Sequence, residues 1–175
     1  MTANSELIEL HIDDVAHGGH FVARSGESTY FVRHTAPGER VMASVTRSIQ
    51  GGRVRFADAV EVLEPSPQRT EPPCSKAGVC GGCDFPHLRF GYQRALKTEV
   101  LRSQLVRMGK LPSDHPALRT EVKPLDGDDS GLGWRTRVDL HSDGRGRLGF
   151  REHGSSRVAT ITGCPITIAG LLEDG

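Results

Sequence analysis

Four cysteines are the residues of this sequence best suited to chemistry. The first three lie together in the run C-x5-C-G-G-C, and the last stands far along the chain before a proline: Cys74, Cys80, Cys83 and Cys164. Two thiolates separated by two residues can turn back onto one metal ion, and the pair Gly81-Gly82 between them allows a tight loop. We therefore predict that all four cysteines are ligands of one metal site.

The spacing of the cysteines also bears on which metal is bound. Structural zinc usually takes two pairs of closely spaced ligands, whereas three clustered cysteines with a remote fourth before a proline favour an iron-sulfur cluster. We predict a [4Fe-4S] cluster, with zinc as the alternative. Residues 1–14 contain neither a basic leader nor an apolar core, so we expect a reducing cytoplasmic location, where disulfides rarely persist.

The composition is that of a soluble globular protein, with 36% apolar residues, 25% charged residues and zero formal net charge. No apolar run reaches the ~18 residues expected of a membrane-spanning helix, so no membrane partner is expected. Basic residues are concentrated in the stretches 89–110 and 135–157. These stretches fit either a solvated helix face and a polar hairpin, or a surface that follows nucleic-acid phosphates.

The elements that must position these residues begin with a small barrel. Residues 7–63 contain five short strand patterns separated by glycine and proline turns. This spacing predicts a five-stranded barrel of the OB type, a fold that commonly binds oligonucleotides. Within it, Val41, Ala43 and Val45 alternate with more polar residues, as a half-buried strand requires.

A mainly β, α+β fold with one long helix is expected for the whole chain. A proline-rich, extended linker follows the barrel, and apolar residues recurring every three or four positions predict a helix at 89–108. Strands are then expected at 134–142, 147–154 and 156–162. The predicted units are the barrel, the linker with the cysteine loop, the helix, and part of a β-rich central domain: 1–65, 66–88, 89–110 and 111–175.

Two further patterns invite a functional interpretation. Residues 144–149 match G-x-G-x-x-G, a cofactor fingerprint, but strand patterns lie on both sides where a helix should follow, so we interpret the run as a hairpin turn. No cofactor-binding residue is predicted there. None of the histidines has helical ligand spacing, and His87 is expected to support the cysteine loop because four thiolates already complete a cluster.

The cysteine run is followed by His87, Gln93 and Lys97, and further on by the motifs W-R-x-R and C-P. This series of motifs resembles the bacterial RNA uracil-C5 methyltransferases. In that family a TRAM barrel, which is an OB-type RNA-binding domain, precedes a [4Fe-4S] cluster, a central RNA-binding domain and an S-adenosylmethionine domain. Residues 23–45, with their Pro-Gly-Glu turn, are also similar to the TRAM pattern. One departure is the segment 84–86, where the family more often carries polar residues including glutamine.

The resemblance implies a protein that binds ribosomal or transfer RNA. In the family, the arginine after the aromatic residue of W-R-x-R lies near the target nucleotide, which corresponds to Arg135 here. The residues expected to contact RNA are Arg135, Arg137, Arg94 and Lys97. In the family, the helix that corresponds to the one expected at 89–108 packs against the methyltransferase domain. The resemblance therefore also implies that an apolar face of this helix is exposed in this chain.

The chemistry of the family requires groups that this sequence lacks. A cysteine thiolate adds to C6 of the uracil before C5 is methylated, and all four cysteines here are assigned to the metal site. The strand-helix units of an S-adenosylmethionine domain are also missing, so that cofactor would be bound only through an absent domain. We therefore predict no catalytic residues and an inactive N-terminal portion of a methyltransferase.

Two other functions compete with this one. The alternative is a freestanding TRAM-type RNA-binding or adaptor protein with a structural metal site made of four cysteines. A radical S-adenosylmethionine enzyme is disfavoured because those enzymes use C-x3-C-x2-C, whereas the first gap here is five residues.

Overall fold

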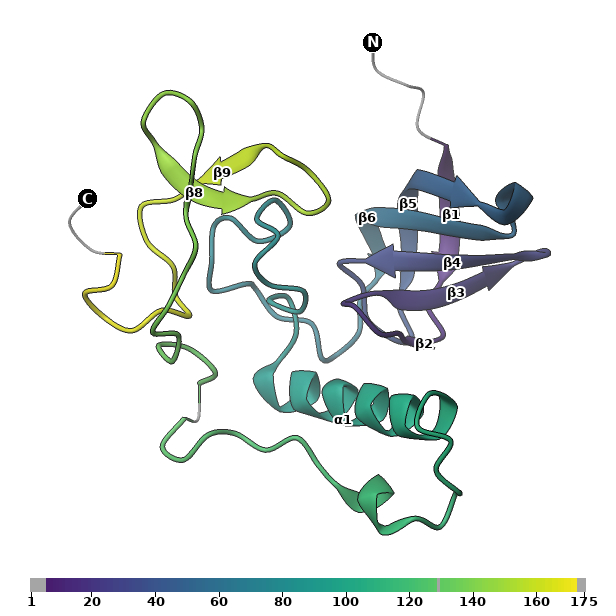
Figure 1. Cartoon of the computed structure of the whole chain (residues 1–175). Helices are drawn as coiled ribbons and strands as arrows, with labels where there is room; N and C mark the ends of the chain where they lie inside the picture. The colour runs from purple at the N-terminus through teal and green to yellow at the C-terminus, as the bar shows by residue number, and fades with distance from the viewer. Residues whose placement is uncertain (1–5, 129, 173–175) are drawn as a thin grey trace.

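The computed structural model describes residues 6–128 and 130–172 of the chain. Two β-sheets and one long helix dominate this part, which confirms the predicted mainly β fold. In Figure 1 the N-terminal sheet lies at the right, the C-terminal sheet at the upper left and the helix below, while the loops between β6 and α1 run between the two sheets.

The N-terminal sheet contains six strands in the order β1-β5-β6-β4-β3-β2. Neighbouring strands are antiparallel except β4 and β6, which are parallel. A 3-10 turn, η1 (Gln50–Gly52), connects β5 to β6. The strands are β1 (Leu7–His11), β2 (Asp14–Val15), β3 (Phe21–Ser25), β4 (Ser28–Arg33), β5 (Arg40–Ile49) and β6 (Val54–Glu64).

This sheet is rolled but not closed into the predicted five-stranded barrel. Its two edge strands, β1 and β2, belong to one continuous segment that bends between Ile12 and Asp13. The Ile12 N–H donates to the carbonyl of Glu39, extending the pairing of β1 with β5, whereas the Asp13 N–H donates to Val22 on β3. The number of strands differs from the prediction because this bend divides one predicted strand into two.

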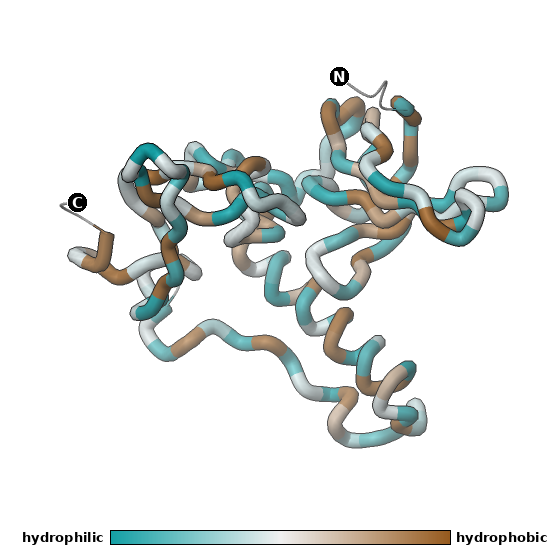
Figure 2. The backbone as a smooth tube through the Cα atoms, turned by 45° about the horizontal axis from the view of Figure 1, so that its top comes forward, coloured by the Kyte–Doolittle hydropathy of each residue, from teal (hydrophilic) through white to brown (hydrophobic). Residues whose placement is uncertain are grey.

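The core of the N-terminal sheet follows the predicted alternation. Val41 and Ala43 on β5 are fully buried and Val45 packs against the same core, so the predicted face is confirmed. Phe21, Tyr30 and further inward residues of β1, β3, β4 and β6 complete the cluster. Figure 2 shows hydrophobic and hydrophilic segments intermingled over the N-terminal sheet, as expected where one face is buried.

The long helix, α1 (Phe90–Arg107), matches the predicted helix to within one residue at each end. Leu96 is buried in the core of the N-terminal sheet and Tyr92 packs against that core, so the first half of the predicted exposed apolar face is covered. Val106 and Met108 at the other end are exposed. None of the helices in the described ranges is long and apolar enough to traverse a bilayer.

A second, three-stranded sheet lies in the C-terminal part, after the short 3-10 turn η2 (Pro116–Arg119). Its strands pair antiparallel in the order β7-β8-β9. They are β7 (His141–Ser142), β8 (Leu148–Arg151) and β9 (Val158–Thr160). The run 144–149 lies in the turn between β7 and β8 and in β8 itself, which confirms the hairpin interpretation.

The predicted strand at 134–142 is wrong over most of its length. Only His141–Ser142 pairs as a strand, and Trp134 and Arg135 are joined instead to residues 165–168. Residues 136–140 form no backbone hydrogen bond within the ranges that the structure describes. A strand requires a partner as well as a pattern, and these residues lack one here.

A buried carboxylate connects the N-terminal sheet to the linker. Glu39, in the turn before β5, is fully buried, and its side chain accepts hydrogen bonds from the backbone N–H groups of Ala36 and Ser66. Arg69 of the linker donates Nε at 2.7 Å and Nη2 at 2.6 Å to the same carboxylate, and Nη2 also donates to the carbonyl of His34. The linker is therefore fixed to the sheet at its start.

His87 makes a second connection between the same turn and the segment before α1. Its ring is buried, and Nε2 donates to the carbonyl of Thr35 at 2.8 Å. Its backbone carbonyl accepts from the Thr70 N–H. Burial lowers the pKa of His87 to about 4, so the imidazole is neutral near pH 7. His87 thus fixes the segment that follows the cysteine loop to the N-terminal sheet and the linker, while its support of the loop itself stays a prediction.

We predict that Glu39→Gln lowers the free energy of unfolding by roughly 3 kcal/mol, because it leaves the Arg69 guanidinium without its charged partner. Urea denaturation followed by circular dichroism measures this change. The control is Glu64→Gln, which removes an exposed carboxylate from Arg40 and is expected to have a much smaller effect. Equal effects of the two substitutions would show that the buried pair has no special role.

We also predict a loss of stability between pH 6.5 and pH 4. His87 takes up a proton near pH 6.5 in the unfolded chain but only near pH 4 in the folded chain. Between these two pH values the unfolded chain binds more protons, so the stability of the folded chain decreases as the pH falls. The difference between the native chain and His87→Gln should change by about 2–3 kcal/mol across this window. His11→Gln, at an exposed position, is the control. Parallel pH profiles for the native chain and His87→Gln would contradict the prediction.

Candidate metal centre and nucleic-acid interface

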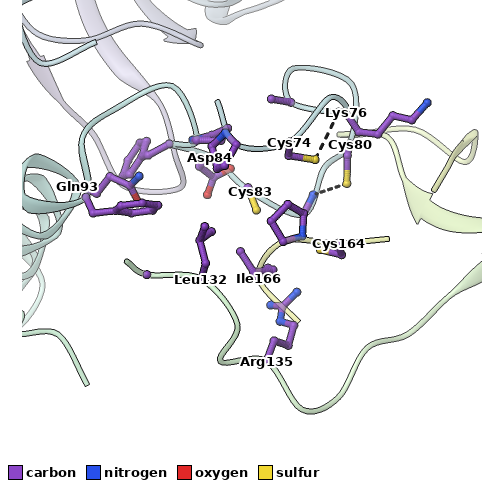
Figure 3. A pocket seen from close by; sticks show the side chains of 18 of the residues that line it. Cys74, Lys76, Cys80, Cys83, Asp84, Gln93, Leu132, Arg135, Cys164 and Ile166 are labelled. Carbon is purple, nitrogen blue, oxygen red and sulfur yellow. Dashed lines mark hydrogen bonds between the residues drawn. The ribbon is translucent and has the colours of Figure 1, made fainter. Parts of the chain in front are cut away.

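The four cysteines line one cavity of about 260 Å³ between the C-terminal sheet and the start of α1. They reach it from two distant parts of the sequence, the loop at 74–83 and the turn at Cys164. In Figure 3 their sulfur atoms gather around the same space, with Arg135 and Ile166 below them and Asp84 and Gln93 to one side. The structure thus brings the predicted ligands together.

Backbone N–H groups are directed at two of the sulfur atoms. The N–H of Lys76 donates to Cys74 Sγ at 3.4 Å, and the N–H of Gly82 donates to Cys80 Sγ at 3.4 Å (Figure 3). Such bonds favour the thiolate, which is the form that binds metal. No cysteine is engaged in a disulfide.

The thiols are close enough to affect one another's ionisation. Burial, together with the negative charges of the other three thiols, raises the pKa of Cys83 to about 11, while the Arg135 guanidinium opposes the increase. Burial also raises the pKa of Cys80. A bound cation would reverse both effects, because it compensates the negative charge of every thiolate around it.

The donor set fits a soft metal, although the side chains are not arranged as a closed coordination shell. Within residues 6–128 and 130–172, no three His, Cys, Asp or Glu side chains have the geometry to hold a metal ion. The cavity nevertheless contains four thiols, and two of them accept hydrogen bonds from backbone N–H groups. Four thiolates are the ligands that zinc and iron-sulfur clusters use.

Contacts with the hairpin of β8 and β9 hold the cysteine loop in place. The Gly81 N–H donates to the carbonyl of Arg151 at 2.9 Å, and Cys80 forms an isolated bridge with Glu152. A Cβ atom at Gly81 would lie 3.0 Å from that carbonyl oxygen, so a larger residue would push the hairpin away. The close approach of the remote hairpin therefore favours glycine at this position.

The turn that carries Cys164 is tied to the segment that carries Arg135. The N–H groups of Trp134 and Arg135 both donate to the carbonyl of Ile166, at 3.0 and 2.7 Å. Thr167 donates its N–H and its hydroxyl to the carbonyl of Cys164, at 3.0 and 2.7 Å. The position of the remote thiol and that of the guanidinium are consequently coupled through a few backbone bonds.

The predicted RNA-binding residues come together around this cavity. Lys97 and Arg135 line the cysteine cavity itself, Arg94 lines a neighbouring cavity with Lys97, and Arg137 lines another with Arg135. None of these four side chains forms an ion pair with a described residue, unlike Arg102 on the same helix, which pairs with Glu99. The cations of two separate basic stretches therefore share one side of the molecule.

Three residues of this region were not singled out for function by the sequence. Trp134 is 46% exposed and lines all three cavities, and the Arg135 guanidinium lies 5.4 Å from the centre of its ring. Phe90 and Lys123 line the cavity beside α1. Trp134 is the first residue of the strand predicted at 134–142, where an aromatic side chain is as often core as surface, so the W-R-x-R motif did not mark it as a contact residue.

Comparison with known proteins gives a consistent set of similarities, although no protein-family model matches the chain. An uncharacterized RNA methyltransferase of Streptomyces coelicolor is 45% identical over 177 residues, covering 97% of this chain and 39% of that protein. The 23S rRNA (uracil(1939)-C(5))-methyltransferase of Halomonas elongata is 42% identical over 171 residues, covering 93% of this chain and 33% of that protein.

A solved structure has a similar fold. The tRNA (uracil-54, C5)-methyltransferase of Pyrococcus abyssi, crystallised with S-adenosyl-L-homocysteine, matches with a TM-score of 0.55 and 21% sequence identity. The match covers 91% of this chain and 33% of that protein. This chain therefore spans well under half the length of each of the three proteins to which it is similar.

Proposed function

We propose that this chain, which is a homologue of bacterial RNA methyltransferases over the N-terminal part of their length, is the RNA-binding and metal-binding portion of an RNA uracil-C5 methyltransferase. The observation that carries the proposal is the meeting of four thiols and four predicted RNA-binding cations at adjoining cavities. The identity to proteins named as RNA methyltransferases favours this function over that of a freestanding adaptor.

The metal site is proposed to be structural. Cys74, Cys80, Cys83 and Cys164 would hold a [4Fe-4S] cluster, with zinc as the alternative metal. When bound, the cluster would supply metal-thiolate bonds that cross-link the loop at 74–83 to the turn at Cys164, with every thiol occupied. Because that turn is hydrogen-bonded to the Arg135 segment, the cross-link would fix the guanidinium relative to α1.

The cations are proposed to contact RNA. Arg94, Lys97 and Arg137 would bind phosphates, and the planar guanidinium of Arg135 would lie near the target nucleotide. Phosphate contacts position a nucleic acid without reading its sequence, so either ribosomal or transfer RNA fits this surface.

Methyl transfer is proposed to require more than this chain. The reaction needs a thiolate that adds to C6 of the uracil, and every cysteine here faces the shared cavity. S-adenosylmethionine would bind to a part of the relatives that this chain does not span. The chain is therefore expected to bind RNA without methylating it.

Anaerobic purification followed by iron and sulfide analysis tests the metal assignment. We expect about four irons and four sulfides per chain, with broad absorption in the visible range, as four thiolate ligands imply. Cys164→Ser should lose most of the iron, whereas Ser75→Ala, an exposed neighbour of Cys74, should retain it. A colourless protein with one stoichiometric zinc would establish the alternative metal and reject the cluster.

A salt titration of RNA affinity tests the RNA-binding assignment. We expect affinity to fall steeply with ionic strength, and the combined substitutions Arg94→Gln, Lys97→Gln and Arg137→Gln to reduce the slope of log affinity against log salt by about 2. The control replaces three arginines that are already paired with carboxylates: Arg24, Arg40 and Arg157. Affinity that does not respond to salt, or equal effects of the two triple variants, would contradict the assignment.

A further inference from the structure

We propose that Trp134 is a stacking platform for an unpaired base of the bound RNA, with Lys123 among the cations around it. The inference rests on the proposed RNA-binding function and adds to it a contact residue and a class of RNA. It is carried by the exposure, fixation and surroundings of the indole ring.

The exposure of Trp134 is unusual for its type. It is the only tryptophan of the chain, and it is the one aromatic residue among the strongly exposed large apolar side chains of the described ranges. The phenylalanine and tyrosine rings, such as those of Phe21 and Tyr30 in the core, are all largely or partly buried. An indole kept in solvent beside cavities is a surface on which another flat, apolar group can stack.

The backbone that carries the ring is also held in place. The Trp134 N–H donates to the carbonyl of Ile166 at 3.0 Å, the Gly133 N–H donates to that of Pro165 at 3.0 Å, and the Ile168 N–H donates to that of Arg135 at 3.0 Å. The Arg135 guanidinium lies over the indole at 5.4 Å from its centre. A platform fixed in advance loses little conformational entropy when a base stacks on it.

The charge around the indole suits a polyanion. Six cations line the cavities that Trp134 shares: Lys76, Arg94, Lys97, Lys123, Arg135 and Arg137. Three carboxylates line them too, Asp84, Asp128 and Asp139, and the Asp128 carboxylate already accepts the N–H groups of Ser130 and Gly131. The balance around the ring is positive, so phosphates can be bound while a base lies on the indole.

This combination selects one class of RNA. In a duplex, each base is stacked between its neighbours and its face is unavailable to a protein side chain. Stacking on Trp134 therefore requires a single-stranded segment or a nucleotide displaced from a helix. We infer that the surface binds unpaired RNA in preference to duplex RNA.

Because the chain has a single tryptophan, its intrinsic fluorescence reports directly on this site. The full chain is titrated with a single-stranded oligouridylate of about 12 nucleotides, with the same oligonucleotide annealed to its complement, and with inorganic polyphosphate. Stacking predicts strong quenching by the single strand and little by the duplex or the polyphosphate. Equal quenching by polyphosphate would show that charge alone perturbs the indole and would overturn the proposal.

Affinity is measured separately, by fluorescence anisotropy of a labelled oligouridylate. We expect Trp134→Leu to weaken binding by roughly 5- to 100-fold, and Trp134→Phe to retain most of the affinity because a benzene ring still stacks. Leu148→Ala, which removes an exposed apolar side chain from β8, should bind like the native chain. Circular dichroism establishes that each variant is folded before its affinity is compared.

The outcomes separate this inference from the proposed function. If the anisotropy shows no RNA binding by the native chain, the RNA-binding function fails and the inference with it. If RNA binds with the expected salt dependence, but without quenching and with equal affinity for the native chain and Trp134→Leu, only the stacking platform is rejected.

Discussion

The buried carboxylate of Glu39 is the constraint on which the arrangement of the molecule depends. A carboxylate without solvent must have all its oxygens satisfied, and here two backbone N–H groups and the fork of Arg69 do so. Arg69 belongs to the linker and Ala36 to the turn before β5, so these bonds hold the linker against that turn and fix the direction in which the chain leaves the N-terminal sheet. That direction leads to the cysteine loop.

The cysteine loop and the residues directly after it are then placed by contacts with two separate parts of the chain. Phe85 is buried against Phe21 of the N-terminal sheet, at 5.4 Å between ring centres, and a Cβ atom at Gly19 would overlap the side chain of Asp84. On its other side the loop is bonded to β8 through Gly81. The segment 84–86, which departs from the family pattern, is thus the segment that packs the loop against the sheet.

The sequence predicted those features whose signal is local. The helix was predicted because its apolar residues repeat every three or four positions, and the thiol site because four cysteines have metal-ligand spacing and none is left over. Glu39 was noted only as part of a turn, because a charged residue is normally exposed and nothing local indicates that Arg69 will reach it. The strand at 134–142 was predicted from alternation, yet pairing is a non-local property that alternation cannot establish.

The same distinction explains why the proposed nucleic-acid surface was only partly predictable. Arg94 and Lys97 lie on α1, whereas Arg135 and Arg137 follow a long loop, and nothing in the sequence places these pairs together. They meet because α1 is fixed by Leu96 in the core, and because the Arg135 segment is fixed to the turn of Cys164. The four cysteines and four cations are therefore not independent features. Under the proposed function, a metal bound by the thiols would also help to set the distance between the two pairs of cations, and would act on RNA through geometry and not through reaction.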